Sequence, residues 1–337
     1  MRKFLLASVL SASFSTPLLA AEAAAPATPS GIVAAAPASE WVRIAPENLL
    51  VMDLAPDAAG KPRRVVIQLI GAPFSQDWVE NIRKLAAAHW YDGIAVVRVQ
   101  DNYVVQWGDP DGEDAKKAKP LPAGLAPTSQ RNYSVAISSL PANSRTLPPP
   151  IQVCTGGQCP DQPALPGNLD WRPYVARNDI YAQRTTFKNG FPIGVDLDAG
   201  LAWPVHCYGY IGVGRNMSPD AGTGAELYAV IGHAPRQLDR NVAVVGRVIE
   251  GIEYLSSLPR GTDEMGFYAS PSERVRIAKV RMGTAVADLP GYQYLSTESD
   301  SFAAYAAKRA NRKDDFYTQP AGGADVCNVP VPIRIAK

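Results

Sequence analysis

An arginine, an aromatic residue and a glutamine stand close together on two extended segments of this chain. Arg98 lies in the first segment, and Tyr103 and Gln106 lie in the second, after a short polar turn. A guanidinium is permanently charged and presents its donors in one plane, so it can hold a polarised group in a fixed orientation. Taken alone, Arg98 would be assigned to a surface ion pair. No arrangement of nucleophile, base and acid can be assembled elsewhere in the sequence.

The stretch resembles the active-site sequence of the cyclophilins, which catalyse cis/trans isomerisation of Xaa-Pro bonds. The family pattern is Phe-His-Arg, a short turn, and then Phe-Met-x-Gln-Gly-Gly-Asp. The matching offsets in this chain hold Arg98, Tyr103, Val104, Gln106, Gly108 and Asp109. With these neighbours, we interpret Arg98 as a functional residue.

Two later segments also resemble cyclophilin motifs. Residues 224–229 are similar to the family's Gly-Ser-Gln-Phe-Phe-Ile strand, and residues 238–251 to its Leu-Asp-Gly-Lys-His-Val-Val-Phe-Gly-Lys-Val-x-x-Gly motif. The resemblance covers about residues 48–109 and 206–283 in the family's order. It implies a mainly β fold, a closed antiparallel β-barrel with capping helices.

The resemblance also implies a mechanism that needs no nucleophile, metal or cofactor. Amide resonance sets a barrier of about 18–20 kcal/mol to rotation about a prolyl bond. In cyclophilins an arginine donates a hydrogen bond towards the prolyl nitrogen of the twisted amide, which stabilises mainly the transition state. The resemblance implies that Arg98 would take that catalytic role here and that Gln106 would hold a substrate carbonyl. The other substrate-binding positions are occupied by Tyr103, Val104, Glu226, Leu227 and Tyr228.

Ordinary barrel core is the alternative role for these apolar residues, because most strand residues of this kind are buried for packing. Leu227 is out of phase with Tyr228 along its strand, which leaves open that it faces the core.

Several positions depart from the family pattern. The family's histidine before the arginine, its strand glutamine, its tryptophan before Leu-Asp and its histidine after Gly-Lys are replaced here by Val97, Glu226, Gln237 and Val242. A carboxylate at 226 would either hold the guanidinium of Arg98 in place or occupy donors that a substrate needs. The sequence leaves both outcomes open.

The elements that position these residues follow from hydrophobic periodicity. Apolar runs predict strands at 49–54 and 64–70, and an apolar stripe beginning with Trp78 and Ile82 predicts a helix that starts at 75–77 and ends by 92–93. Further strands are expected at 208–213, 226–231 and 275–280, with a helix at 252–258. The predicted cyclophilin-like domain, 48–283, is interrupted by an insertion at 110–205 and followed by an extension, 284–337, that carries a helical pattern around Phe302 and Tyr305.

The beginning of the chain reads as an export signal. Residues 1–23 combine a basic start, a short apolar run and small residues at the expected cleavage site. The apolar run is shorter than the roughly 20 residues that span a bilayer, and no later segment qualifies. We therefore expect a periplasmic or secreted protein, with residues 24–47 as a disordered leader.

Four cysteines fit an oxidising compartment, where two disulfides can form by three pairings. The cysteines are Cys154, Cys159, Cys207 and Cys327. A local Cys154–Cys159 bridge would leave Cys207 with Cys327, tying the tail to the core. Scattered cysteines make a metal site the weaker alternative.

The net charge of +1 and pI near 7.6 give no sign of a nucleic-acid partner. The sequence therefore predicts a monomeric, exported prolyl isomerase that acts on proline-containing segments of other proteins. Two alternatives stay open. One is a catalytically weak or inactive module that binds such segments as a chaperone or assembly factor, and the other is a structural envelope protein whose insertion makes the contacts.

Overall fold

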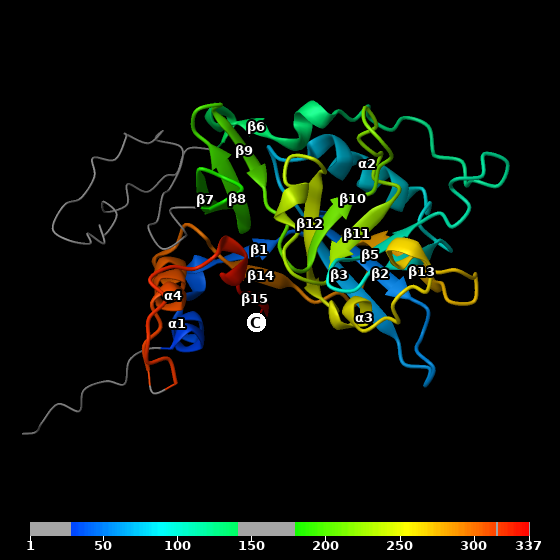
Figure 1. Cartoon of the computed structure of the whole chain (residues 1–337). Coiled ribbons are helices and arrows are strands. Elements are labelled where there is room, and N and C mark those ends of the chain that lie inside the picture. The colour runs from blue at the N-terminus through cyan, green and yellow to red at the C-terminus, as the bar shows by residue number, and fades with distance from the viewer. Residues whose placement is uncertain (1–27, 141–178, 315, 337) are drawn as a thin grey trace, which may run out of the picture.

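An eight-stranded antiparallel barrel forms the centre of the protein. The computed structural model describes residues 28–140, 179–314 and 316–336. Around the barrel the strands follow the order β10-β11-β5-β4-β13-β2-β3-β12, and β12 pairs with β10 to close it (Figure 1). Their bounds are β2 Leu49–Leu54, β3 Arg63–Leu69, β4 Ala95–Val99, β5 Val104–Gly108, β10 Tyr210–Val213, β11 Leu227–Val230, β12 Val244–Glu250 and β13 Val275–Met282. The predicted closed barrel is confirmed.

Two helices flank the barrel, with α2 above it and α3 below it in Figure 1. Helix α2, Gln76–Ala87, buries the predicted apolar stripe, including Trp78 and Ile82, while its charged residues remain on the outer side. The indole Nε1 of Trp78 donates to the carbonyl oxygens of Ala221 and Gly222, which anchors the loop before β11 to this helix. Helix α3 runs from Glu253 to Ser256, inside the range predicted for it.

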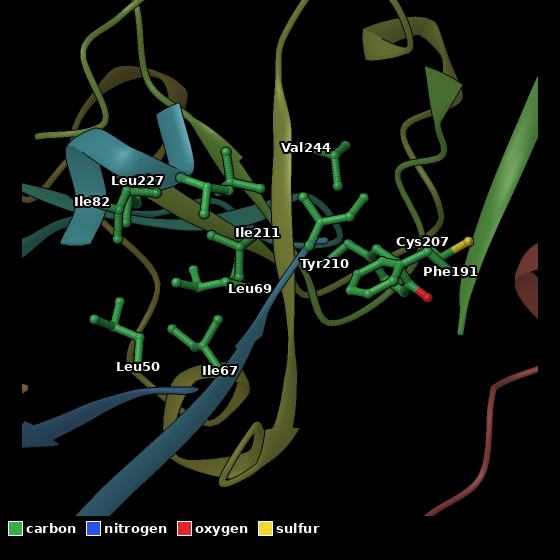
Figure 2. Close-up of a cluster of buried hydrophobic side chains, with 14 of the residues drawn as sticks. Leu50, Ile67, Leu69, Ile82, Phe191, Cys207, Tyr210, Ile211, Leu227 and Val244 are labelled. Atoms are coloured by element: carbon green, nitrogen blue, oxygen red, sulfur yellow. The ribbon is translucent and has the colours of Figure 1, made fainter. Parts of the chain in front are cut away.

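The described part of the insertion builds a separate four-stranded antiparallel sheet beside the barrel (Figure 1). Its strands, in the spatial order β6-β9-β8-β7, are β6 Val135–Ala136, β9 Leu201–Pro204, β8 Phe191–Asp196 and β7 Arg184–Lys188. Figure 2 shows Phe191 beside Tyr210 and Cys207, where this sheet meets the barrel, and the two aromatic rings pack edge to face at 6.0 Å.

The two ends of the described chain meet in a third structural element. Strands β1 Trp41–Ile44, β14 Tyr292–Leu295 and β15 Ile333–Ile335 form one antiparallel sheet, and helix α1, Pro29–Ala35, packs against α4, Asp300–Ala310. The prediction of a disordered leader over 24–47 is therefore wrong from Pro29 onwards. Thr28 caps α1 by accepting a hydrogen bond from the Gly31 N–H, and β1 pairs with a strand about 250 residues further along the chain. Local composition contains no information on so distant a partner as β14, so it does not predict this pairing.

Side chains join the inserted sheet to this terminal element, so we call the two together the accessory unit. Phe187 of β7 packs against Phe302 of α4 with ring centroids 5.0 Å apart, and the Gly190 N–H donates to Thr297 Oγ1 at 3.1 Å. Arg247 of β12 lies over the rings of Phe191 in β8 and Tyr294 in β14. These two contacts link the accessory unit to the barrel.

A disulfide makes a covalent link between barrel and tail. Cys207 precedes β10 and is bonded to Cys327 in the short helix η8, as predicted for this pair. Cys154 and Cys159 lie outside the described residues, as does the predicted signal peptide.

Short 3-10 helices complete the described fold: η1 Ala38–Glu40, η2 Pro46–Asn48, η3 Gln130–Tyr133, η4 Ile137–Ser139, η5 Arg236–Leu238, η6 Glu264–Gly266, η7 Gly283–Ala285 and η8 Val326–Asn328. Of the helices in the described ranges, none has the length and apolar content needed to cross a membrane.

Candidate active site

Arg98 and Gln106 face each other across the β4–β5 hairpin. The strand register pairs the two residues directly, because a bulge between Val96 and Arg98 shifts the ladder by one position. Such a bulge re-aims the side chains that follow it. Arg98 Nη1 donates to Gln106 Oε1 at 3.0 Å, so the two polar residues predicted for the site are in direct contact.

The guanidinium of Arg98 is fixed from three sides. Besides Gln106, it donates from Nε to the Met265 carbonyl oxygen at 2.7 Å and from Nη2 to Gln100 Oε1. Its central carbon lies 5.6 Å from the ring centroid of Tyr103 and 5.2 Å from that of Phe267. Three of its five N–H donors are therefore engaged, and one hydrogen on each terminal nitrogen remains for a substrate.

Gln100, Met265 and Phe267 were not predicted from the sequence. Met265 and Phe267 lie in and just after η6, and Phe267 forms an isolated bridge with Arg98. Nothing in the local pattern of that loop signals a contact with a residue about 170 positions earlier. A site shell built from such distant loops is visible only in the fold.

Burial disfavours the charged form of the arginine. Partial desolvation lowers the pKa of Arg98 from its ordinary value, and the neighbouring Tyr103 and Glu226 oppose that shift. Because an arginine pKa lies above about 12, the side chain stays cationic at neutral pH.

Gln106 stands between Arg98 and Glu226. Its amide oxygen accepts from Arg98, and its Nε2 donates to Glu226 Oε1, so both neighbours dictate the same orientation of the amide. In the described part of the chain, Glu226 thus reaches Arg98 through Gln106 and not by a direct ion pair. The carboxylate restrains the site without occupying the donors of Arg98. Of the two outcomes that the sequence left open for Glu226, the structure favours the one in which a substrate can still reach those donors.

Desolvation raises the pKa of Glu226 above its ordinary value of 4.5, and the hydrogen bond from Gln106 partly opposes this. A carboxyl group with a raised pKa favours the folded state most at low pH, and that contribution is lost as pH rises through the raised pKa. We therefore expect Glu226→Gln to raise the melting temperature at pH 7, where the wild type buries a charge. Calorimetry at pH 7, 5.5 and 4 should show the difference between variant and wild type shrinking with decreasing pH. A difference that is constant over this range would contradict the assignment.

A second apolar cluster lies apart from the barrel core. Val104, Tyr228 and Val230 are buried together, and Tyr103, Leu238 and Val242 pack around them, partly exposed. We call these six residues the Tyr228 cluster. Tyr103 belongs to it and also lies beside the Arg98 guanidinium, so the apolar cluster and the cation adjoin.

Leu227 does not belong to this cluster. It is 1% exposed and packs in the main core, where Figure 2 shows it beside Ile82 and Ile211. Its assignment to substrate binding is wrong because successive residues of a strand point to opposite faces, and Tyr228 takes the outer one. Leu238 was missed as a cluster member, although it is the leucine of the Leu-Asp motif.

Tyr228 lies across a glycine of the neighbouring strand. The register of β10 and β11 sets Gly212 opposite Tyr228, and a Cβ at position 212 would overlap the tyrosine Cζ and hydroxyl. Complete burial raises the pKa of Tyr228 well above its usual range, so the hydroxyl keeps its proton.

We expect Gly212→Ala to destabilise the fold by about 1–3 kcal/mol, the usual effect of overpacking a rigid site. Urea unfolding measures this directly. The matched control is Gly71→Ala, where an added Cβ meets nothing within 4 Å and the backbone lies outside the left-handed region. A loss at Gly212 no larger than that at Gly71 would contradict close packing.

Among the described residues, no group of His, Cys, Asp and Glu is arranged to hold a metal ion. The site thus consists of a restrained guanidinium with two free hydrogens, an amide beside it and an adjoining apolar cluster. That arrangement suits hydrogen bonding to a polarised amide.

Comparison with known proteins gives evidence on the family of this chain. Residues 64–282 match the family model described as cyclophilin type peptidyl-prolyl cis-trans isomerase/CLD. A search of curated proteins gave no match. The crystal structure of the cyclophilin AquaCyp293 from Hirschia baltica aligns with 93% of this chain and 100% of its own, at 19% identity and a TM-score of 0.59. A cyclophilin type isomerase from Cryptosporidium parvum, determined in the presence of the dipeptide Ala-Pro, covers 69% of this chain and 98% of its own, at 11% identity and a TM-score of 0.35. The family match spans well over half of the sequence, and the chain belongs to the cyclophilin-type peptidyl-prolyl cis-trans isomerase family.

Proposed function

We propose that this protein accelerates the cis/trans isomerisation of Xaa-Pro bonds in exported proteins, with Arg98 as its catalytic residue. The observation that carries the proposal is the guanidinium of Arg98, which is held in one orientation beside an apolar cluster and keeps two hydrogens free. A proline ring bound against Tyr103, Val104 and Tyr228 would place its amide next to those hydrogens.

The chemistry requires no bond to form or break. As the amide twists, resonance is lost and the lone pair localises on the prolyl nitrogen, which then becomes a hydrogen-bond acceptor. Arg98 donates to that nitrogen in the twisted state, so the interaction is stronger in the transition state than in the planar substrate. Gln106 uses one amide hydrogen on Glu226 and keeps the other for a substrate carbonyl.

Export is supported by two independent features. The first 23 residues have the composition of a secretory signal. The Cys207–Cys327 disulfide suits an oxidising compartment such as the periplasm or the exterior of the cell. The substrates we propose are therefore unfolded or partly folded exported chains.

A proline-binding chaperone with little catalytic activity is the second candidate. Its supporting observation is the number of contacts on Arg98, because three hydrogen bonds limit how far the guanidinium can follow a rotating amide. Gln237 and Val242 stand where the family has tryptophan and histidine, which changes the edge of the Tyr228 cluster.

Refolding kinetics distinguish the two candidates. Slow refolding phases limited by prolyl isomerisation take roughly 10–100 s, so acceleration is easily followed. The mature protein, added at a hundredth of the concentration of an unrelated refolding chain, should shorten that phase. The matched control is a refolding chain without a proline-limited phase, whose rate should not change. An unchanged proline-limited phase, from folded protein that still binds Xaa-Pro peptides, would favour the chaperone.

A further inference from the structure

A buried polar chain runs from the Tyr228 cluster towards the accessory unit, and the mechanism above uses only its first member. The Tyr228 hydroxyl lies 2.9 Å from His206 Nε2, and His206 Nδ1 lies 2.9 Å from Asp239 Oδ1. Arg236 donates from Nε to Asp239 Oδ2 at 2.5 Å and from both terminal nitrogens to Asp179, at 2.7 and 3.0 Å. The His206 side chain is 1% exposed, and the three charged side chains are nearly as well buried.

Asp239 determines the direction of its hydrogen bond with His206. Because a carboxylate only accepts, His206 donates from Nδ1, and in the neutral imidazole Nε2 is then an acceptor. The Tyr228 hydroxyl then donates to Nε2, consistent with a tyrosine whose burial raises its pKa and preserves its proton. The backbone N–H of His206 also donates to Asp239 Oδ1, at 3.0 Å, which fixes the segment as well as the ring.

This segment is anchored independently of the tyrosine. Cys207 follows His206 directly and carries the disulfide to Cys327, and the Cys327 sulfur contacts the His206 carbonyl oxygen. His206 is thus a rigid hydrogen-bond acceptor at the far end of the Tyr228 ring, while the strand β11 holds the near end. The two rings lie almost parallel, at 11°, with centroids 6.2 Å apart.

We propose that His206, oriented by Asp239, is a positioning residue for substrate binding: it holds the Tyr228 ring across Gly212 and so shapes the apolar cluster that receives proline. This inference rests on the proposed function. Without His206, the buried hydroxyl has lost its acceptor, and an unsatisfied buried donor destabilises the position it occupies. The ring is then expected to move away from Gly212 so that its hydroxyl can bond to another partner. That movement changes the shape of the Tyr228 cluster, where proline would bind.

The test is a double-mutant cycle of His206→Ala and Tyr228→Phe, read as the Kd of an Xaa-Pro peptide in NMR titrations. We expect His206→Ala to weaken binding about three- to tenfold in the wild type, and less than about twofold in the Tyr228→Phe background, where the hydrogen bond is already absent. kcat should change less than about twofold, because His206 contacts neither Arg98 nor Gln106. The matched control is His89→Ala, which removes an exposed histidine and should leave Kd unchanged.

His206→Gln provides a second variant in case the alanine variant does not fold. Its amide oxygen can still accept from the tyrosine hydroxyl, so it should recover at least half of the lost affinity. Carbon-13 relaxation at the Tyr228 ε positions reports directly on the ring, which should flip slowly in the wild type and faster in His206→Ala.

Each outcome decides the inference. Equal ring dynamics in the two proteins, or the same loss of affinity in both tyrosine backgrounds, would overturn the positioning role while leaving the proposed function intact. A Tyr228 ring that flips faster in His206→Ala, with an unchanged Kd for the peptide, would also overturn the positioning role and leave the proposed function intact. If the wild type bound no Xaa-Pro peptide, the proposed function and this inference would be overturned together.

Discussion

Arg98→Ala is expected to lower kcat/KM for an Xaa-Pro peptide by about 10²–10³-fold, the usual effect of removing one preorganised donor to a transition state. The peptide Kd should change by less than about threefold, because the planar substrate gains little from that donor and binds through the Tyr228 cluster. Rate and affinity are measured separately, by NMR exchange and by titration, on the same peptide.

Two control variants sharpen this prediction. Arg98→Lys keeps the charge but presents one nitrogen, so it cannot contact Gln100, Gln106 and Met265 together and should recover little activity. Arg260→Ala removes an exposed arginine that pairs with Asp101 outside the site, and it should leave kcat/KM unchanged. Wild-type turnover by a folded Arg98→Ala variant would refute the assignment of Arg98 as the catalytic residue.

The second large effect concerns stability. Replacing Cys207 and Cys327 together by serine is expected to lower the free energy of unfolding by about 4–5 kcal/mol. The disulfide closes a loop between residues 120 positions apart, and the chain-entropy model gives a contribution of that size for so long a loop.

Guanidinium unfolding of the oxidised wild type and the double variant measures the difference. Reductant serves as the control. It should destabilise the wild type by breaking the Cys207–Cys327 bond, and it should not cause this loss in the variant, which lacks that bond. A loss below about 1 kcal/mol would show that noncovalent contacts hold the tail to the barrel.

Much of the barrel could be predicted because its signals are local. The apolar runs at 49–54 and 64–70 and the stripe beginning at Trp78 can each be recognised from one segment of sequence, and they correspond to β2, β3 and α2. Arg98 and Gln106 could both be proposed for the site from matching offsets within a single hairpin, but their direct hydrogen bond was not predicted.

The inserted sheet was missed although part of its signal was available. Asn189-Gly190 separates a segment with strand-forming Thr and Phe residues from a largely apolar one, which indicates a tight hairpin, and both residues have positive φ between β7 and β8. Treating residues 110–205 as a single insertion without strands of its own overlooks that turn.

The remaining features depend on partners far apart in the chain. Helix α1 and strand β1 are ordered against the C-terminal segment, and Phe267 reaches Arg98 from a distant loop. His206 lies next to Tyr228 only because the fold brings the segment before β10 to β11. No local sequence pattern predicts contacts of this kind.

The most direct test of the account is the cis/trans exchange rate of an Xaa-Pro peptide, measured by NMR with the mature wild-type protein at about one-hundredth of the peptide concentration. The account predicts exchange well above the uncatalysed rate, which has a time constant of tens of seconds or longer at room temperature. It also predicts chemical-shift changes at Tyr103 and Tyr228 when the protein is titrated with the peptide. Shift changes at those residues with exchange at the uncatalysed rate would contradict catalysis and leave a cyclophilin that only binds.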